Sequence, residues 1–570
     1  MTRDERLAYF NELVTPNTRL MDIFDRTVDL CGDNIFIKEY ETNNTITWNQ
    51  MRKSTDLLAK GLIAYGIGKG DHVLIWGKNS IQWVICFLAC IKIGAISVLG
   101  NTANKEMETE YILKNSDIKM VLMDEGINSV QYAQVMEALC PGCLNRKWNG
   151  QEEYPFLRYV VTFHKEGNEN GLKLSDLYKK AESISNATLH EQASCVLASD
   201  IINIQYTSGT TGDPKGAMWD QRCLLYNLQG ISADLEMHMG DKLYTSLPIF
   251  HNFGLLGCIV YPIIYGITVV FSTKFNPNEY LRAMQEEKPA LVLGVTTMFL
   301  AMLACPGFRM YNFSNERLQI ALAGSLCPKA LLEALRSDFK TDKVIVIYGL
   351  TEAAASANTN MSDPLTQQLT SIGRASGSYT FKICDPVTRK VLPRGMEGEI
   401  AIKGIAVMRG YYKKPEETAR VLDKEGWFYT GDIARMDEEG YVYISGRAKD
   451  MINRGGEKIF PKEIENFLLS HPYISDAQII GVPSQRYGEE VLAYIIKKPG
   501  KSLTEEEVKE FIRSHMAIYK TPKYVRFIDK FPCTLSGKVQ NAICAARRPL
   551  VRLPAATRRS PTATFIKVFR

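Results

Sequence analysis

A short run between residues 206 and 216 combines glycines, hydroxyls and one lysine in a way that suits anion binding. The run reads YTSGTTGDPKG and follows the apolar stretch IINIQ. Glycines let backbone N–H groups approach an anion closely, hydroxyls add neutral donors, and a lysine adds positive charge. The residues concerned are Thr207, Ser208, Gly209, Thr210, Thr211, Gly212, Lys215 and Gly216. The composition predicts a phosphate-binding loop, although a surface loop without function can have the same make-up.

The run differs from the P-loop of nucleoside triphosphatases. Pro214 stands where that motif has a glycine before its lysine, and Gly216 stands where it has serine or threonine. If this run binds phosphate, it must do so through a loop of a different type from the P-loop.

The run resembles the signature loop of the adenylate-forming superfamily, which includes acyl-CoA synthetases, luciferases and the adenylation domains of peptide synthetases. Further motifs follow in the order typical of that superfamily, and the resemblance covers about residues 20–545. They are PIFHNFG (248–254), ALAGS (321–325), YGLTE (348–352), GEIAIKG (398–404), YTGD (429–432), GRAKDMINRGGEKIFPKEIE (446–465) and PCTLSGK (532–538). So many motifs in one order make coincidence negligible.

The motif YGLTE follows the apolar run KVIVI, at the carboxyl end of an expected strand, where open α/β sheets bind ligands. The resemblance implies that the Tyr348 ring stacks on adenine, with Gly349 beside it in the nucleotide site. It also implies that Thr351 offers a hydroxyl to the α-phosphate and that Glu352 offers a hard oxygen ligand to Mg²⁺. By itself, a glutamate after a strand is better explained as a favourable charge at a helix start.

Two more motifs complete the nucleotide site that the resemblance implies. Gly324 and Ser325 of ALAGS would pack against the base and the acyl pocket. Asp432 of YTGD would accept both ribose hydroxyls, because a carboxylate is an acceptor with two oxygens, and Arg447 would be the second ribose contact. Either charged residue alone is more often a surface charge.

The C-terminal motifs imply a moving domain. Lys538 resembles the superfamily's mobile lysine, whose ammonium would lie between the substrate carboxylate and the α-phosphate in the transition state. Without the resemblance, it would be interpreted as an exposed turn lysine. Lys449 matches the hinge position, and Gly455 and Gly456 would leave room for the pantetheine arm of coenzyme A after the small domain rotates.

The stretch PIFHNFG bears on the class of acid. The resemblance places His251 near the acyl carboxylate, where it would gate the thiol channel, although a lone histidine in an apolar segment is more often a core residue. Superfamily members that activate amino acids have an aspartate here, whereas this chain has His251 and Asn252. A substrate ammonium would be buried without a partner, which is costly. We therefore expect a fatty, branched or alicyclic acid, with a carnitine-like acid also open.

The elements that hold these motifs form an α/β fold. Between about residues 70 and 350, short β-branched runs alternate with helical patterns, which favours mostly parallel sheets covered on both faces. From about 378 to 447, short strands with Gly- and Asp-containing turns predict an antiparallel, β-barrel-like subdomain. A small α+β domain follows. We expect an AMP-binding domain at 1–448, a mobile domain at 449–545 and a basic, disordered tail at 546–570.

Composition and charge argue against a disordered chain and against a nucleic-acid-binding protein. The chain of 570 residues is 45% hydrophobic and 23% charged, so it is too apolar to be disordered. Seven of its basic residues lie in 541–570, and the rest of the chain carries 61 basic against 63 acidic residues, so we expect no nucleic-acid partner. The thirteen scattered cysteines favour a reducing compartment, and we expect a cytoplasmic location.

One uncharged stretch, residues 254–272, is long enough to cross a bilayer. It is better explained as a buried helix broken near Pro262, a turn at Gly266 and the strand ITVVFS. We therefore expect no transmembrane segment.

The sequence thus predicts an AMP-forming ligase. A carboxylic acid would attack the α-phosphorus of ATP with release of pyrophosphate, and the acyl-AMP would pass its acyl group to coenzyme A, with Mg²⁺ as the metal. Two alternatives stay open: an adenylating enzyme that loads a carrier protein, and a non-catalytic nucleotide- or acyl-binding protein. The oligomeric state, monomer or homodimer, is open as well.

Overall fold

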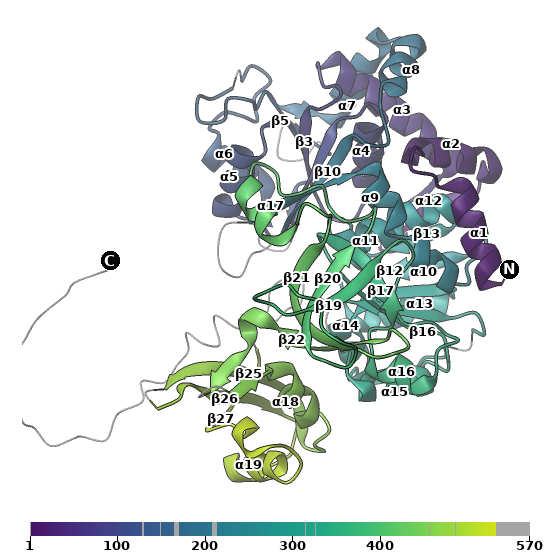
Figure 1. Ribbon diagram of the computed structural model, residues 1–570. Coiled ribbons are helices and arrows are strands. Elements are labelled where there is room, and N and C mark those ends of the chain that lie inside the picture. The colour runs from purple at the N-terminus through teal and green to yellow at the C-terminus, as the bar shows by residue number, and fades with distance from the viewer. Residues whose placement is uncertain are drawn as a thin grey trace, which may run out of the picture. The chain divides into compact units, whose positions relative to one another are not determined.

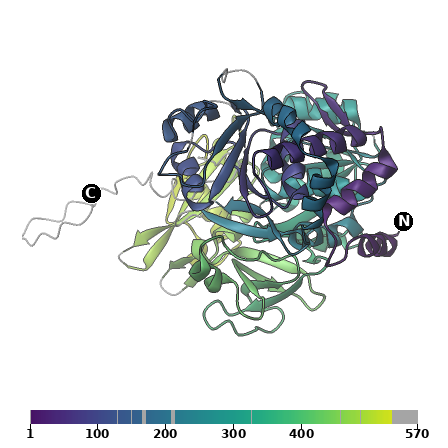
Figure 2. The same cartoon turned by 90° about the horizontal axis from the view of Figure 1, so that it is seen from above.

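The computed structural model describes residues 2–127, 130–148, 150–164, 170–207, 214–313, 315–324, 327–454, 457–484 and 486–531. The chain divides into two compact units, residues 1–449 and 450–570. The first unit holds two large sheets, a four-stranded sheet and a two-stranded sheet formed by β6 (Gly126–Ile127) and β7 (Val130–Gln131). Figures 1 and 2 both place its first helix at the periphery.

A seven-stranded sheet forms the first layer of the larger unit, in the order β11-β10-β4-β3-β5-β8-β9. Its strands are parallel except for β11, which pairs antiparallel with β10. The bounds are β3 His72–Trp76, β4 Ile96–Gly100, β5 Ile118–Met123, β8 Tyr159–Thr162, β9 Leu172–Lys173, β10 Ile201–Thr207 and β11 Lys215–Asp220. Strands β3, β4, β5, β8 and β10 coincide with apolar runs of the sequence, whereas β9 and β11 are not predicted as strands.

Strand β3 shows that this sheet is apolar on both faces. Val73 and Ile75 pack into the main hydrophobic cluster, whereas Leu74 and Trp76 pack into a second cluster. Successive side chains of a strand point to opposite faces, so a continuous apolar run implies cover on both sides. All five residues of β3 are buried.

A nine-stranded sheet forms the second layer, in the order β18-β17-β16-β15-β14-β12-β13-β1-β2. Neighbours from β16 to β1 pair in parallel, and the two ends of the sheet are antiparallel. The bounds are β1 Ile35–Glu39, β2 Thr45–Thr47, β12 Lys242–Thr245, β13 Thr268–Phe271, β14 Leu291–Val295, β15 Gln319–Ala323, β16 Val344–Leu350, β17 Ala353–Asn358 and β18 Arg374–Ala375.

Helices cover both sheets (Figure 1). One of them, α4 (Ile81–Lys92), is apolar around its whole circumference and is buried from Trp83 to Ile91, as expected for a helix inside the core. The other helices of this unit are α1 Arg3–Leu13, α2 Leu20–Cys31, α3 Trp48–Ala64, α5 Glu106–Asn115, α6 Tyr132–Leu139, α7 Leu174–Lys180, α8 Asn186–Ser194, α9 Gln221–Tyr226, α10 Gln229–Asp234, α11 Asn252–Leu255, α12 Tyr261–Tyr265, α13 Pro277–Glu287, α14 Thr296–Leu303, α15 Lys329–Asp338, α16 Leu365–Thr370 and α17 Pro415–Val421.

The uncharged stretch 254–272 is a buried helical segment followed by a strand. A π-helical turn over Leu256–Val260 joins α11 to α12, and Pro262 lies in the first turn of α12. The irregular turn therefore directly precedes Pro262, a residue that cannot donate the backbone hydrogen bond of a continuous α-helix. Gly266 ends α12 with a φ of 65° and β13 follows, as the sequence predicts. Among the described residues, no helix is both long enough and apolar enough to cross a membrane.

Four antiparallel strands form the third sheet of the larger unit, in the order β19-β20-β21-β22. They are β19 Thr380–Cys384, β20 Gly398–Lys403, β21 Phe428–Met436 and β22 Val442–Arg447. This is the strand-rich subdomain that the sequence predicts.

The smaller unit has its own five-stranded sheet and its own hydrophobic core. Its elements are β23 Ile452–Arg454, β24 Glu457–Ile459, α18 Pro461–Leu468, β25 Ile474–Ser484, β26 Gly488–Lys497, α19 Glu505–Arg513 and β27 Tyr524–Phe527. The β23–β24 hairpin is the part that sequence patterning does not reveal, because INRGGEKI lacks a clear apolar alternation.

Gly254 permits a close approach at the start of α11. A Cβ at this position would lie 2.1 Å from the carbonyl oxygen of Pro248. We expect Gly254→Ala to lower the free energy of unfolding by about 1–3 kcal/mol, because backbone must shift to accept the methyl group. Urea unfolding measures the change.

Gly68→Ala is the matched control, since its Cβ would have no neighbour closer than 3.6 Å. Equal stability of the two variants would contradict the requirement for glycine at position 254.

Candidate active site

The carboxyl edge of the nine-stranded sheet brings together two motif segments, ALAGS and YGLTE. Val295 of β14 is in register with Ala323 of β15, and Leu322 of β15 with Val346 of β16. Parallel strands end at the same edge, so Gly324 and Tyr348 come from neighbouring strand ends. Gly324 has a φ of 93°, and a Cβ there would lie 3.2 Å from the Val295 side chain.

The motif YGLTE forms the hairpin between β16 and β17. Leu350 pairs with Ala353, so Thr351 and Glu352 are the two residues of the turn. A Cβ on Gly349 would lie 2.5 Å from the backbone nitrogen of Ala355, which explains the glycine before the turn. The glutamate lies in a strand-to-strand turn and not at a helix start.

Three donors from other segments fix the backbone of this turn. The indole Nε1 of Trp219 donates to the Thr351 carbonyl at 2.9 Å, and the Asn252 amide donates to the Leu350 carbonyl at 3.1 Å. The backbone N–H of Met408 donates to the Glu352 carbonyl at 2.8 Å. Sequence reasoning did not identify Trp219 or Met408, and neither has a local signal that could have revealed it.

The Glu352 carboxylate has one oxygen engaged. The Tyr411 hydroxyl donates to Glu352 Oε1 at 2.6 Å, while Oε2 makes no hydrogen bond to a described residue. Mg²⁺ is usually held by one or two carboxylates together with substrate phosphates and water. No group of three or more His, Cys, Asp or Glu that could hold a metal occurs among the described residues.

Asp432 is the centre of a buried polar cluster. It is 4% exposed, and it is the cross-strand partner of Arg447 in the β21–β22 pair. Arg447 Nε lies 2.6 Å from Asp432 Oδ1, and the Tyr348 hydroxyl donates to Asp432 Oδ2 at 2.6 Å. Burial and the neighbouring Asp432 carboxylate raise the pKa of Tyr348, which keeps this phenol a donor. The cluster therefore brings together three residues that the sequence predicts for one nucleotide site.

The β10–β11 hairpin carries the glycine-rich run. Thr207 pairs with Lys215, and its hydroxyl donates to the Lys215 carbonyl at 3.4 Å. At the base of the hairpin, the Tyr206 hydroxyl accepts from the Asn115 amide at 2.6 Å. The intervening Ser208, Gly209, Thr210, Thr211 and Gly212 lie outside the described residues.

Lys215 is paired at the end of this hairpin. Its Nζ lies 2.5 Å from Glu417 Oε2 of α17 and 5.3 Å from the centre of the Tyr411 ring. The same tyrosine hydroxyl reaches Glu352, so one ring connects the lysine of the first sheet with the carboxylate of the second. Glu417 and Tyr411 were not identified from the sequence.

His251 is exposed and directly precedes α11, with its backbone N–H donating to the Pro248 carbonyl at 3.2 Å. Phe250 and Phe253, which lie close to His251 in the sequence, are half-buried. Phe299 is fully buried, and its ring meets that of Phe339 edge-on at 6.4 Å, so it belongs to the hydrophobic core.

The remaining predicted residues lie at the unit boundary or beyond the described part of the chain. Lys449 falls in the 3₁₀ turn Ala448–Asp450, where the first unit ends. Ser325, Gly455, Gly456, Lys538 and the tail 546–570 are outside the described residues.

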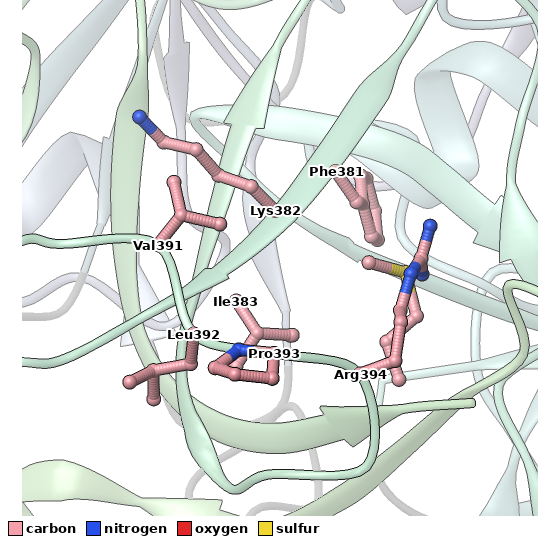
Figure 3. Close-up of a pocket in the computed structure, with 8 residues that line it drawn as sticks. Phe381, Lys382, Ile383, Val391, Leu392, Pro393 and Arg394 are labelled. Carbon is pink, nitrogen blue, oxygen red and sulfur yellow. The ribbon is translucent and has the colours of Figure 1, made fainter. Parts of the chain in front are cut away.

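A surface hollow of about 330 Å³ lies on the four-stranded sheet (Figure 3). It is lined by Phe381, Lys382, Ile383, Val391, Leu392, Pro393, Arg394 and Met436. None of the site residues predicted from the sequence lines it, so it is separate from the clusters around Glu352 and Asp432.

Comparison with protein families gives two matches. The family described as AMP-binding enzyme matches residues 24–412, and the AMP-binding enzyme C-terminal domain matches residues 463–538.

Known proteins with similar sequences share most of their length with this chain. YngI of Bacillus subtilis (strain 168), named as a candidate acyl-CoA synthetase, is 35% identical over 522 residues, covering 91% of this chain and 95% of YngI. The rat protein named medium-chain acyl-CoA ligase ACSF2, mitochondrial, is 35% identical over 512 residues, covering 87% of this chain and 82% of that protein. Among solved structures, ATP-bound MatB from Rhodopseudomonas palustris has a TM-score of 0.78 at 26% identity, covering 93% of this chain and 99% of MatB.

A half-buried glutamate supports the turn before Asp432. Glu399 Oε1 accepts from the Gly431 backbone N–H at 2.7 Å, and burial raises the pKa of Glu399 above its ordinary 4.5. The folded state then holds a proton that the unfolded state has lost, so this group's contribution to stability falls as pH rises from about 4.5 through the raised pKa.

We expect Glu399→Gln to keep a hydrogen-bond acceptor for the Gly431 N–H. It should remove the fall in stability with rising pH, because an amide side chain does not titrate in this range. Its stability relative to wild type should rise as the pH increases above about 4.5, measured by urea unfolding. Glu439→Gln, at an exposed position, is the control. A stability difference that stays flat with pH would contradict the expected role of Glu399.

Proposed function

The chain belongs to the family of AMP-binding enzymes, and on this premise we propose that it activates an apolar carboxylic acid of medium chain length. It is an AMP-forming acid–CoA ligase: ATP converts the acid to acyl-AMP, and coenzyme A receives the acyl group. The acid's chain length is supported by the rat relative, which is named a medium-chain ligase.

One observation carries the assignment of the site. Along β16, Tyr348 contacts Asp432 while the following turn presents Thr351 and Glu352, and Tyr411 links Glu352 to Lys215. We assign the Asp432–Arg447–Tyr348 cluster to the adenosine end of ATP. Thr351, Glu352, Lys215 and the glycine-rich run take the phosphates. Segments far apart in the sequence thereby form one continuous path for the nucleotide.

The reaction needs positioning and charge neutralisation. A carboxylate and a triphosphate repel each other, so attack on the α-phosphorus requires cationic groups and donors around the developing charge. Lys215 and backbone donors of the loop would bind the phosphates, and Lys538 would approach the α-phosphate from the small domain. Pyrophosphate leaves as the acyl–AMP bond forms, and AMP leaves when the thiol sulfur attacks the acyl carbonyl.

Glu352 is our proposed holder of Mg²⁺. The metal would supply neutralisation of phosphate charge, and a carboxylate oxygen is the ligand type that it prefers. Tyr411 and the Met408 N–H hold the side chain and the backbone of Glu352, so the carboxylate is fixed before the nucleotide arrives.

The segment around His251 supports an apolar acid. The Asn252 amide is engaged with the Leu350 carbonyl, and no carboxylate stands at either position to pair with a substrate ammonium. An amino acid would leave its ammonium buried and unpaired. We propose that His251 contacts the carboxyl end of the acid and gates access of the thiol.

We also propose that the protein works in the cytoplasm. The eleven cysteines within the described residues are free thiols, which suits a reducing compartment. The mitochondrial location given in the names of the ACSF2 relatives describes those proteins.

A panel of acids tests the function. Purified protein is incubated with ATP, Mg²⁺, coenzyme A and straight-chain acids of increasing length, together with branched, alicyclic, carnitine-like and amino acids. We expect AMP, pyrophosphate and acyl-CoA in equal amounts, with the highest kcat/KM for medium-chain acids. Release of ADP, or acyl-AMP without acyl-CoA, would contradict the proposal, and the latter would favour loading of a carrier protein.

The boundary at Lys449 suggests a hinge between the two half-reactions. We expect Lys449→Pro to keep adenylation near the wild-type rate but to slow thioester formation by tenfold or more, because proline restricts the backbone rotation. Pyrophosphate exchange measures the first step, and transfer from supplied acyl-AMP measures the second.

Lys538→Ala is the reciprocal control, because it should lose adenylation and keep most of the transfer step. Equal loss of both steps in Lys449→Pro would contradict the hinge.

A further inference from the structure

Residues 407–418, here called the strap, run alongside β11 at the edge of the seven-stranded sheet. The Met218 N–H donates to the Gly410 carbonyl at 2.9 Å, and the Arg409 N–H donates to the Met218 carbonyl at 2.8 Å. Two residues after Gly410, the Tyr412 N–H donates to the Gly216 carbonyl at 2.8 Å. These bonds fix the strap's register against the strand that begins at Lys215.

The strap also contacts the turn after β16. The Met408 N–H holds the Glu352 carbonyl, and the Tyr411 hydroxyl holds the Glu352 carboxylate. At the other end of the strap, Glu417 pairs with Lys215 at 2.5 Å. A single segment therefore determines where an ammonium from one sheet and a carboxylate from the other can lie.

Tyr411 is the residue on which both contacts converge. Its side chain is buried, with 6% exposed, and its ring centre is 5.3 Å from the Lys215 ammonium. A hydrogen bond to an ionised carboxylate is stronger and more directional than one between neutral groups.

We propose that Tyr411 is a positioning residue for the adenylation step. Its hydroxyl occupies Glu352 Oε1 and so orients the carboxylate, which leaves Oε2 to the divalent cation that accompanies ATP. The inference rests on the proposed function of Glu352. It assigns Tyr411 no contact with the substrate.

The strap offers a matched control in the adjacent residue. The Tyr412 hydroxyl donates to Asp117 Oδ2 at 2.8 Å, which is also a phenol–carboxylate hydrogen bond. Asp117 belongs to the α5–β5 connection and not to the Glu352 turn. Tyr411→Phe and Tyr412→Phe each remove one hydroxyl and keep the ring, so both lose a similar bond but only one loses the bond to Glu352.

The experiment measures equilibrium binding of ATP to each full-length variant, with Mg²⁺ and with EDTA. We expect Tyr411→Phe to bind ATP about tenfold more weakly than wild type in Mg²⁺, which corresponds to about 1.4 kcal/mol, and equally well in EDTA. Tyr412→Phe should match wild type in both. Unchanged binding by Tyr411→Phe in Mg²⁺, or an equal loss in EDTA, would overturn the proposal.

A double-mutant cycle with Glu352→Gln separates positioning from packing. If Tyr411 acts through Glu352, the double variant should bind Mg²⁺–ATP no more weakly than Glu352→Gln alone. Additive losses would overturn the proposal.

Acyl-CoA formation by wild type in the same preparation tests the proposed function independently. A failure there is therefore distinct from a failure of the Tyr411 inference.

Discussion

The proposed nucleotide site contains two carboxylates, Glu352 and Asp432, and each is held by hydrogen-bonded partners. Glu352 accepts from Tyr411, and Asp432 is shared between Arg447 and Tyr348. A buried, unpaired carboxylate would be costly and would repel phosphate. Each carboxylate has its partner within the larger unit, where Lys215 also lies. In the proposed function, Asp432 is the acceptor for ribose, Glu352 is the acceptor for the metal, and Lys215 supplies positive charge.

The arrangement depends on where strands end. Parallel strands β14, β15 and β16 finish at one edge, so Gly324, Tyr348 and the Thr351–Glu352 turn become neighbours without any direct sequence relation. The β10–β11 hairpin belongs to the other large sheet and brings Lys215. The strap joins the two, because its backbone pairs with β11 while its side chains contact Glu352 and Lys215.

The periodic part of the fold could be predicted from the sequence. Apolar runs such as HVLIW and LVLGV specify strands buried on both faces, and Gly266 specifies the turn before β13. The π-helical turn over 256–260 and the β23–β24 hairpin were missed. Both depend on tertiary packing and not on a local pattern, since an irregular helix and a polar hairpin have no distinctive hydrophobic period.

The sequence by itself determined the family, the fold class and the motif residues, because those residues stand in short runs whose order is specific. Only the tertiary structure decided which partners hold them. Trp219, Tyr411 and Glu417 act on Thr351, Glu352 and Lys215 across long stretches of chain. Hydrogen bonds and ion pairs of this kind depend on distances of about 3 Å between atoms of distant segments. A single sequence carries no periodic or compositional trace of such distances.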